Sequence, residues 1–137
     1  MGRDIGSSTL KKSPVLLFQE LKNSWFVGSL LNKKPGSIGQ IFELRHEAGN
    51  VPVGISSGQK DAKGRIIYNE AHANPGESVT LFGNTQLDDK IGMQIEISER
   101  VFILFKGKAM SPKKREFNDY YIRVLDATED YKQYLPA

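Results

Sequence analysis

The feature that most constrains this chain is a series of short segments in which apolar and polar residues alternate, separated by turns rich in glycine and proline. In residues 39–47, Phe42, Leu44 and His46 fall on one face, which is the pattern of a half-buried β-strand. Residues 99–106 are apolar on both faces, so we expect a central strand there. The same signals predict further strands at residues 25–31, 51–57, 65–69, 78–83 and 120–125. The sequence therefore indicates a mainly β fold.

Residues 85–92 carry the clearest helix signal, although they are long enough for only about two turns. Thr85 is a residue type that caps helices, Asp88 is placed as the acidic partner of a capping box, and Gly92 can end the helix. Residues 15–21 are apolar but short, so they fit either a strand or a single helical turn.

The length of 137 residues corresponds to a single domain, and 39% hydrophobic residues are enough to form its core. We expect this domain at residues 15–126, between a flexible N-terminal arm (1–14) and a C-terminal tail (127–137). No apolar stretch approaches the roughly 18 residues that span a bilayer, and the first residues lack the apolar core of a secretory signal. A soluble cytoplasmic protein without a membrane partner is the expectation.

Enzyme signatures fail in this sequence. The chain has no cysteine, which excludes disulfides, thiol nucleophiles and zinc–thiolate sites. The serine-hydrolase elbow, the phosphate-binding loop and the zinc-protease motif do not occur. His46 fits a core or rim position better than a general base, and Asp88 with Asp89 fits helix capping better than a metal site, since adjacent helical residues point roughly 100° apart. We therefore expect no catalytic residue, no metal and no cofactor.

The positive charge of the chain is concentrated in one stretch. The net charge is +3 overall, but residues 100–123 hold seven basic and two acidic side chains, a net charge of +5, and the remainder sums to −2. A basic patch on a near-neutral body favours a polyanionic partner, although a solvated surface loop gives the same pattern.

Binding of a single-stranded nucleic acid requires cations along a groove for the phosphates and flat side chains on which bases stack. The candidate cations are Lys33, Lys34, Arg45, Lys106, Lys108, Lys113, Lys114, Arg115 and Arg123. The aromatic candidates are Phe82, Phe117 and Tyr121, with Trp25 and Tyr68 as further candidates. The alternative for each ring is packing in the core, where we place Phe42, Phe102 and Phe105.

The predicted element order, with a short helix between the third and fourth main strands, resembles that of the OB-fold, a five-stranded barrel. Residues 51–68 would then form an inserted hairpin. The family binds its ligands with strands two and three and with the loops that join strands one to two and four to five. Here those loops are a predicted turn at residues 32–36 and a predicted loop at residues 107–118, and both are basic.

Residues 75–125 also resemble the OB-like single-stranded-DNA-binding proteins of bacteriophages and mobile elements. The matching segments are residues 75–87, residues 101–108 with the Lys-Gly-Lys turn at their end, and the basic run that leads to Phe117 and Tyr120. The resemblance implies a non-enzymatic protein that binds single-stranded DNA with little sequence preference, in DNA replication or recombination of a phage or mobile element.

Two other functions fit the same sequence. One is an RNA-binding OB domain, because grooves that stack bases accept both nucleic acids. The other is a dimeric interaction or structural module, in which an edge strand such as residues 51–57 pairs between two copies of the chain.

Overall fold

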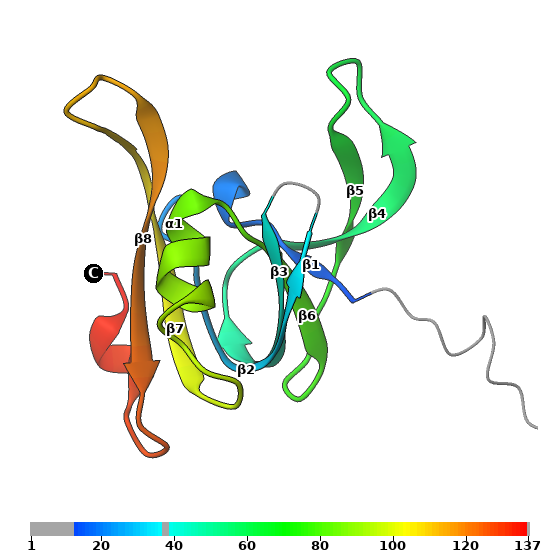
Figure 1. Ribbon diagram of the computed structural model, residues 1–137. Coiled ribbons are helices and arrows are strands. Elements are labelled where there is room, and N and C mark those ends of the chain that lie inside the picture. The colour runs from blue at the N-terminus through cyan, green and yellow to red at the C-terminus, as the bar shows by residue number, and fades with distance from the viewer. Residues whose placement is uncertain (1–12, 37–38, 137) are drawn as a thin grey trace, which may run out of the picture.

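The computed structural model describes residues 13–36 and 39–136 (Figure 1). Within these residues, eight strands form one open mixed sheet in the order β5-β4-β1-β6-β3-β2-β7-β8. The strands are β1 (Val15–Leu16), β2 (Trp25–Pro35), β3 (Gln40–Gly49), β4 (Val53–Lys60), β5 (Ile66–Ala71), β6 (Ser78–Phe82), β7 (Arg100–Met110) and β8 (Glu116–Leu125). The helical elements are the 3-10 turns η2 (Phe18–Glu20) and η4 (Tyr131–Tyr134), the short helix α1 (Thr85–Leu87) and the π-helical turn η3 (Asp88–Gly92) that continues it. The prediction of a mainly β fold with a short helix between β6 and β7 is confirmed.

The sheet is open, and the described residues do not show the predicted five-stranded barrel. One edge of β6 is occupied by β1, which runs parallel to it, and the Thr80 N–H donates to the Pro14 carbonyl at 2.8 Å. The last strand, β8, pairs with β7, and at Tyr120 side chains of the helical segment take the place of a second partner strand. The Tyr120 N–H donates to Gln86 Oε1 at 2.8 Å, and its carbonyl accepts from Lys90 Nζ at 2.8 Å.

The alternation of apolar and polar residues predicts the core correctly. Phe42 and Leu44 of β3 are fully buried, and β7 is apolar on both faces as expected. One face of β7 packs into the main core with Val79 and Leu81 of β6, while Phe102 on the other face belongs to a second, smaller cluster. Phe42, Phe102 and Phe105 are therefore core residues, as predicted.

Two predicted turns are instead strand. Residues 32–35 continue β2, because they pair with β3 as far as Pro35 opposite Gln40. Most of residues 107–118 extends β7 and β8 into a hairpin that closes at residues 111–115. Gly107 has a φ of +96° beside an irregularity in this ladder, a conformation that L side chains rarely adopt. The predicted inserted hairpin is present as β4–β5, and Figure 1 shows that both hairpins project toward the same end of the molecule.

The start of the domain combines both alternatives for residues 15–21. Val15 and Leu16 form β1, and the 3-10 turn η2 follows directly. The helix cap differs from the prediction, because Asn84 and not Thr85 is the N-cap, with its Oδ1 accepting from the Leu87 N–H at 3.0 Å. Of the predicted arm, residues 1–12 lie outside the described residues. No helix in the described part of the chain has the length and apolarity to cross a membrane.

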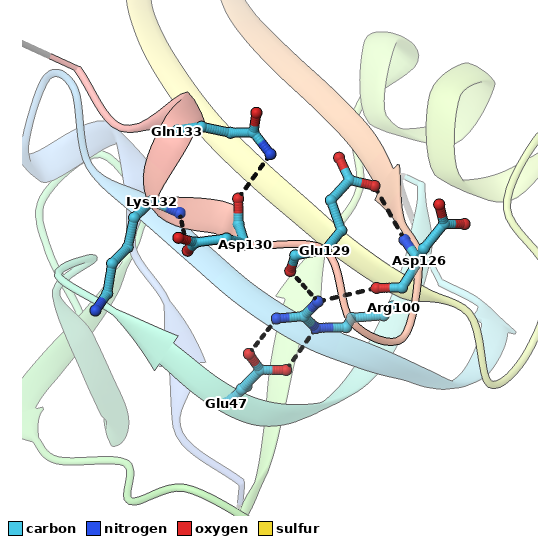
Figure 2. A network of polar contacts seen from close by, with 7 residues as sticks. All are labelled: Glu47, Arg100, Asp126, Glu129, Asp130, Lys132 and Gln133. Carbon is cyan, nitrogen blue, oxygen red and sulfur yellow. Dashed lines mark hydrogen bonds and ion pairs between the residues drawn. The ribbon is translucent and has the colours of Figure 1, made fainter.

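The C-terminal tail packs on the outer face of β2, β7 and β8. The ring of Tyr131 lies 5.3 Å from that of Trp25, and the ring of Tyr134 lies 6.0 Å from that of Phe102. Arg100 of β7 links the tail to β3 (Figure 2), with a bidentate ion pair to Glu47 at 2.8 and 2.6 Å. The same guanidinium donates to two tail carbonyls, of Asp126 at 3.0 Å and of Glu129 at 2.7 Å.

Candidate nucleic-acid interface

Two neighbouring pockets lie between β5 of the β4–β5 hairpin and the start of β8. The first, of about 390 Å³, is lined by Arg65, Ile66 and Tyr68 of the hairpin and by Phe82. The second, of about 460 Å³, is lined by Phe117 and Asn118 of β8 and by Asn84, Thr85, Gln86 and Asp89 of the helical segment. Both pockets include Asn84, so they adjoin. We call the pair the hairpin groove and define it by Arg65, Ile66, Tyr68, Phe82, Asn84 and Phe117.

Local structure explains why Phe82 faces solvent at this groove. It is the last residue of β6, on the face opposite to the buried Leu81, and its side chain is 46% exposed. The chain then turns tightly into α1 at Gly83. Only glycine fits at this position, because a Cβ there would stand 2.1 Å from the Asp88 carboxylate. That carboxylate, which we assigned to a capping box, accepts instead from the Gln40 N–H at 3.2 Å. Phe117 is also partly exposed, at 38%.

The turn of the β7–β8 hairpin presents three predicted cations, Lys113, Lys114 and Arg115. Ser111 closes the turn, since its Oγ accepts from the Arg115 N–H at 3.1 Å and its carbonyl accepts from the Lys114 N–H at 2.9 Å. All three side chains are exposed and make no ion pair with any described residue. Further down the hairpin Lys106 is exposed, while Lys108 pairs with Glu116 at 2.9 Å.

The cations of β2 and β3 have other surroundings. Lys33 Nζ donates to the Gly92 carbonyl at 3.0 Å, and Lys34 pairs with Glu43. Arg45 is exposed on the same face of the β3–β6 pair as Phe82, but Glu43 lies between them on that face. Lys33 and Lys34 are therefore already engaged within the chain, and Arg45 has an acidic neighbour.

Tyr121 and Arg123 are exposed but contact the tail, and they do not line the hairpin groove. Arg123 Nε pairs with Glu129 at 2.7 Å, and its guanidinium sits 4.8 Å above the centre of the Tyr134 ring. Tyr121 packs between Phe102, at 6.2 Å, and Tyr134, at 6.4 Å between ring centres. The structure thus separates these two predicted residues from Phe82 and Phe117.

Sequence reasoning missed Arg65, Ile66 and Asn84. Alternation in residues 65–69 does place Ile66 and Tyr68 on one face of their strand. The alternation does not show that the β4–β5 hairpin brings this face to the same pocket as Phe82. The position of the hairpin depends on the pairing of β4 with the two-residue strand β1.

A larger pocket, of about 520 Å³, lies at the base of the β4–β5 hairpin but is a poor phosphate site. Its lining contains no lysine or arginine and two carboxylates, Glu70 and Glu20, of which Glu20 also lines the 390 Å³ pocket, where Arg65 is present as well. His46 also lines it, packing 5.5 Å edge-on against Phe26, and its Nδ1 is buried without a hydrogen-bond partner among the described residues. Burial lowers the pKa of His46, against an opposing effect of Glu77, so the neutral ring is favoured.

Comparison of the chain with protein-family models, with curated proteins and with solved structures returned no match. The hairpin groove and the basic turn at residues 111–115 are therefore the features of the chain that indicate a function.

Proposed function

We propose that this protein is a non-enzymatic single-stranded-DNA-binding protein that uses the hairpin groove. The observation that carries the proposal is the position of Phe82 and Phe117, two exposed rings in adjoining pockets that share Asn84. The β7–β8 hairpin that supplies Phe117 ends in Lys113, Lys114 and Arg115. Rings for bases and cations for phosphates are the two requirements of single-strand binding.

The arrangement favours an unpaired strand with any sequence. A base must leave its partner before it can stack on a side chain, and every base has a π-face that a phenyl ring accepts. Each stacked base contributes about 1–3 kcal/mol, so two rings provide useful affinity without reading base edges. The resemblance to the OB-fold supports the proposal, because β2, β3, β6, α1, β7 and β8 follow the order expected for that fold. A role in replication or recombination of a phage or mobile element stays a prediction.

Fluorescence anisotropy with labelled oligo-dT at several salt concentrations tests the proposal. We expect binding at micromolar protein or tighter, weakening as salt rises because counterions are released. A matched duplex should compete poorly, and oligo-U in competition decides between DNA and RNA. No binding at micromolar protein, or an affinity independent of salt, would show the proposal to be wrong.

Substitutions in the basic turn sharpen the test. Lys114 has a φ of +59°, which asparagine tolerates, so the suitable triple variant is Lys113→Gln, Lys114→Asn and Arg115→Gln. Since each phosphate contact to a single strand contributes about 0.7 to the slope of log K against log salt, the slope should fall by about 2. Arg115→Gln alone should lower it by about 0.7, and Lys132→Gln, on the tail, should leave it unchanged. Equal slopes for the triple variant and the parent would remove the turn from the interface.

The alternative of a dimeric module keeps part of the strand on which it was predicted. Within residues 51–57, β5 pairs with one side of β4, and β1 pairs with the other side at Val53 and Gly54, so residues 55–57 have no partner strand there among the described residues. The edges of the described sheet are β5 and β8. Sedimentation of the protein alone and with oligo-dT measures the oligomeric state directly.

A further inference from the structure

The β4–β5 hairpin forms the wall of the hairpin groove that faces Phe82. Its strand β5 supplies Ile66 and Tyr68, and Arg65 immediately precedes that strand. The opposite wall consists of Phe82, Gly83 and Asn84, and residues 15–20 line the same pocket. A volume of about 390 Å³ lies in the lower part of the 300–1,000 Å³ range typical of ligand sites, which suits a small planar group.

Packing holds the Tyr68 side chain in this wall. Tyr68 pairs with Ser56 of β4, and a Cβ added at Gly54 would come within 2.8 Å of the Tyr68 Cβ, so β4 leaves room for it only because residue 54 is glycine. The side chain is half-buried, and partial burial raises the pKa of its hydroxyl. This hydroxyl makes no hydrogen bond to another described residue and is not among the buried unpartnered polar atoms, so it is open to solvent.

The tip of the hairpin is cationic. Asp61 is occupied within the turn, since its Oδ1 accepts from the backbone N–H groups of Lys63 and Arg65, both at 2.9 Å, and its Oδ2 pairs with the Arg65 side chain at 3.3 Å. Lys60 and Lys63 are exposed and make no ion pair with any residue in the described ranges. A positive tip above an aromatic wall matches a backbone of phosphates that carries planar bases.

We infer that the β4–β5 hairpin is the second wall of the nucleic-acid site and that Tyr68 stacks on a base opposite Phe82, with the phosphates directed toward Lys60 and Lys63. The inference rests on the proposed function, because it assigns a further binding residue and a path for the same single strand. The bound segment then runs between two cationic hairpins and contacts rings on both sides.

Neighbouring residues of β5 provide a matched test. Ile67 is exposed on the opposite face of the strand and lines neither pocket of the groove. Tyr68→Trp and Ile67→Trp place a fluorophore on the two faces, with Trp25 as a background common to both variants. On titration with oligo-dT, the added fluorescence of Tyr68→Trp should be quenched by the stacked base, and that of Ile67→Trp should not change.

Affinity gives the second measurement. Tyr68→Leu should weaken binding to oligo-dT about 5- to 100-fold, the loss expected for one stacked base, while Tyr68→Phe should bind like the parent. If Tyr68→Leu does not fold, which circular dichroism reports, the contrast in quenching between Tyr68→Trp and Ile67→Trp decides the inference. If the parent binds oligo-dT but both tryptophans respond alike and Tyr68→Leu retains full affinity, the inference is wrong and the proposed function stands. If the parent does not bind, both are wrong.

Discussion

Two surfaces of this protein combine aromatic rings with cations, and they differ in the contacts that these side chains already make within the chain. On the outer face of β7 and β8, Tyr121 is as exposed as Phe117, at 38%, but packs against Tyr134 of the tail, and Arg123 contacts the Tyr134 ring and the Glu129 carboxylate. In the hairpin groove, Phe82 and Phe117 are 46% and 38% exposed and make no ring contact with another described aromatic residue.

A ring beside a cation is therefore not by itself a nucleic-acid site. One acidic residue of the tail, Glu129, pairs with Arg123. Arg100 is paired instead with Glu47 of β3, and the backbone carbonyls of Asp126 and Glu129 accept from its guanidinium (Figure 2). The cations at the tip of the β7–β8 hairpin have no such acidic segment among the described residues. Their charge therefore stays available to an external polyanion.

The largest expected effect separates the two surfaces by stability. Phe102→Ala removes a fully buried ring on which Trp25, Tyr121 and Tyr134 pack, and should lower the free energy of unfolding by about 3–5 kcal/mol. Phe82→Ala, at an exposed position, should change it by no more than about 0.5 kcal/mol. Urea denaturation followed by circular dichroism measures both.

Phe82→Ala, which should have little effect on stability, should have a large effect on the affinity for oligo-dT. Phe82→Ala should weaken oligo-dT binding about 5- to 100-fold although it folds normally, because it removes one stacking surface. A Phe82→Ala protein as destabilised as Phe102→Ala would place Phe82 in the core and contradict the comparison of the two surfaces.

A smaller loss is expected when the tail is detached from the sheet. Arg100 is only 17% exposed in its side chain and donates to Glu47 and to two tail carbonyls. Arg100→Met should cost about 2 kcal/mol, since charged hydrogen bonds are lost but Glu47 stays partly solvated. It should also speed hydrogen exchange in residues 126–136. Arg115→Met, which removes an equal charge from the hairpin turn, should change stability by no more than about 0.5 kcal/mol. Equal effects of the two substitutions would contradict the role of Arg100 as the anchor of the tail.

Much of the fold could be predicted because burial follows local alternation. Phe42, Leu44, Val79 and Leu81 fall on the inner face as expected, and the two-faced segment of β7 lies between β2 and β8, one strand from the end of the sheet. The open sheet could not be predicted, because it depends on two residues, Val15 and Leu16, that have too little sequence to show a period. The extension of β7 and β8 through the basic segment was hidden by its glycine and lysines, which suggest a loop.

The candidate site could be predicted only in part, for a different physical reason. Phe82 and the basic turn were found because exposure and charge are local properties of the sequence. Tyr121 and Arg123 have the same local properties, yet the tail contacts both, and no periodicity reveals a contact between residues 123 and 129 that forms through a turn. The one sign of this contact in the sequence was the charge balance of the last 12 residues, where three acidic residues outnumber one lysine.

The smallest effect concerns the pH dependence of the contacts that the tail makes on the outer face of β7 and β8. The pKa of Glu129 is lowered from 4.5 to about 2, first by the hydrogen bond from the Tyr134 hydroxyl and then by Arg123 and the Asp126 N–H. Because the folded-state pKa is the lower one, Glu129 stabilises the fold fully above pH 4.5. This contribution declines as the pH falls from about 4.5 toward about 2, where the unfolded chain takes up a proton and the folded chain does not.

Urea midpoints between pH 6 and pH 2 check this, with Glu129→Gln as the reference. The stability difference between parent and variant should be constant above pH 4.5 and shrink below it, and Tyr134→Phe, which removes the first of the hydrogen bonds, should give an intermediate profile. Trp25 emission reports the same loss locally, since its ring packs on Tyr131 of the tail. Parallel profiles for the parent and Glu129→Gln would mean that the carboxylate does not hold the tail in solution, and Tyr121 and Arg123 would then be as open to a nucleic acid as the hairpin groove.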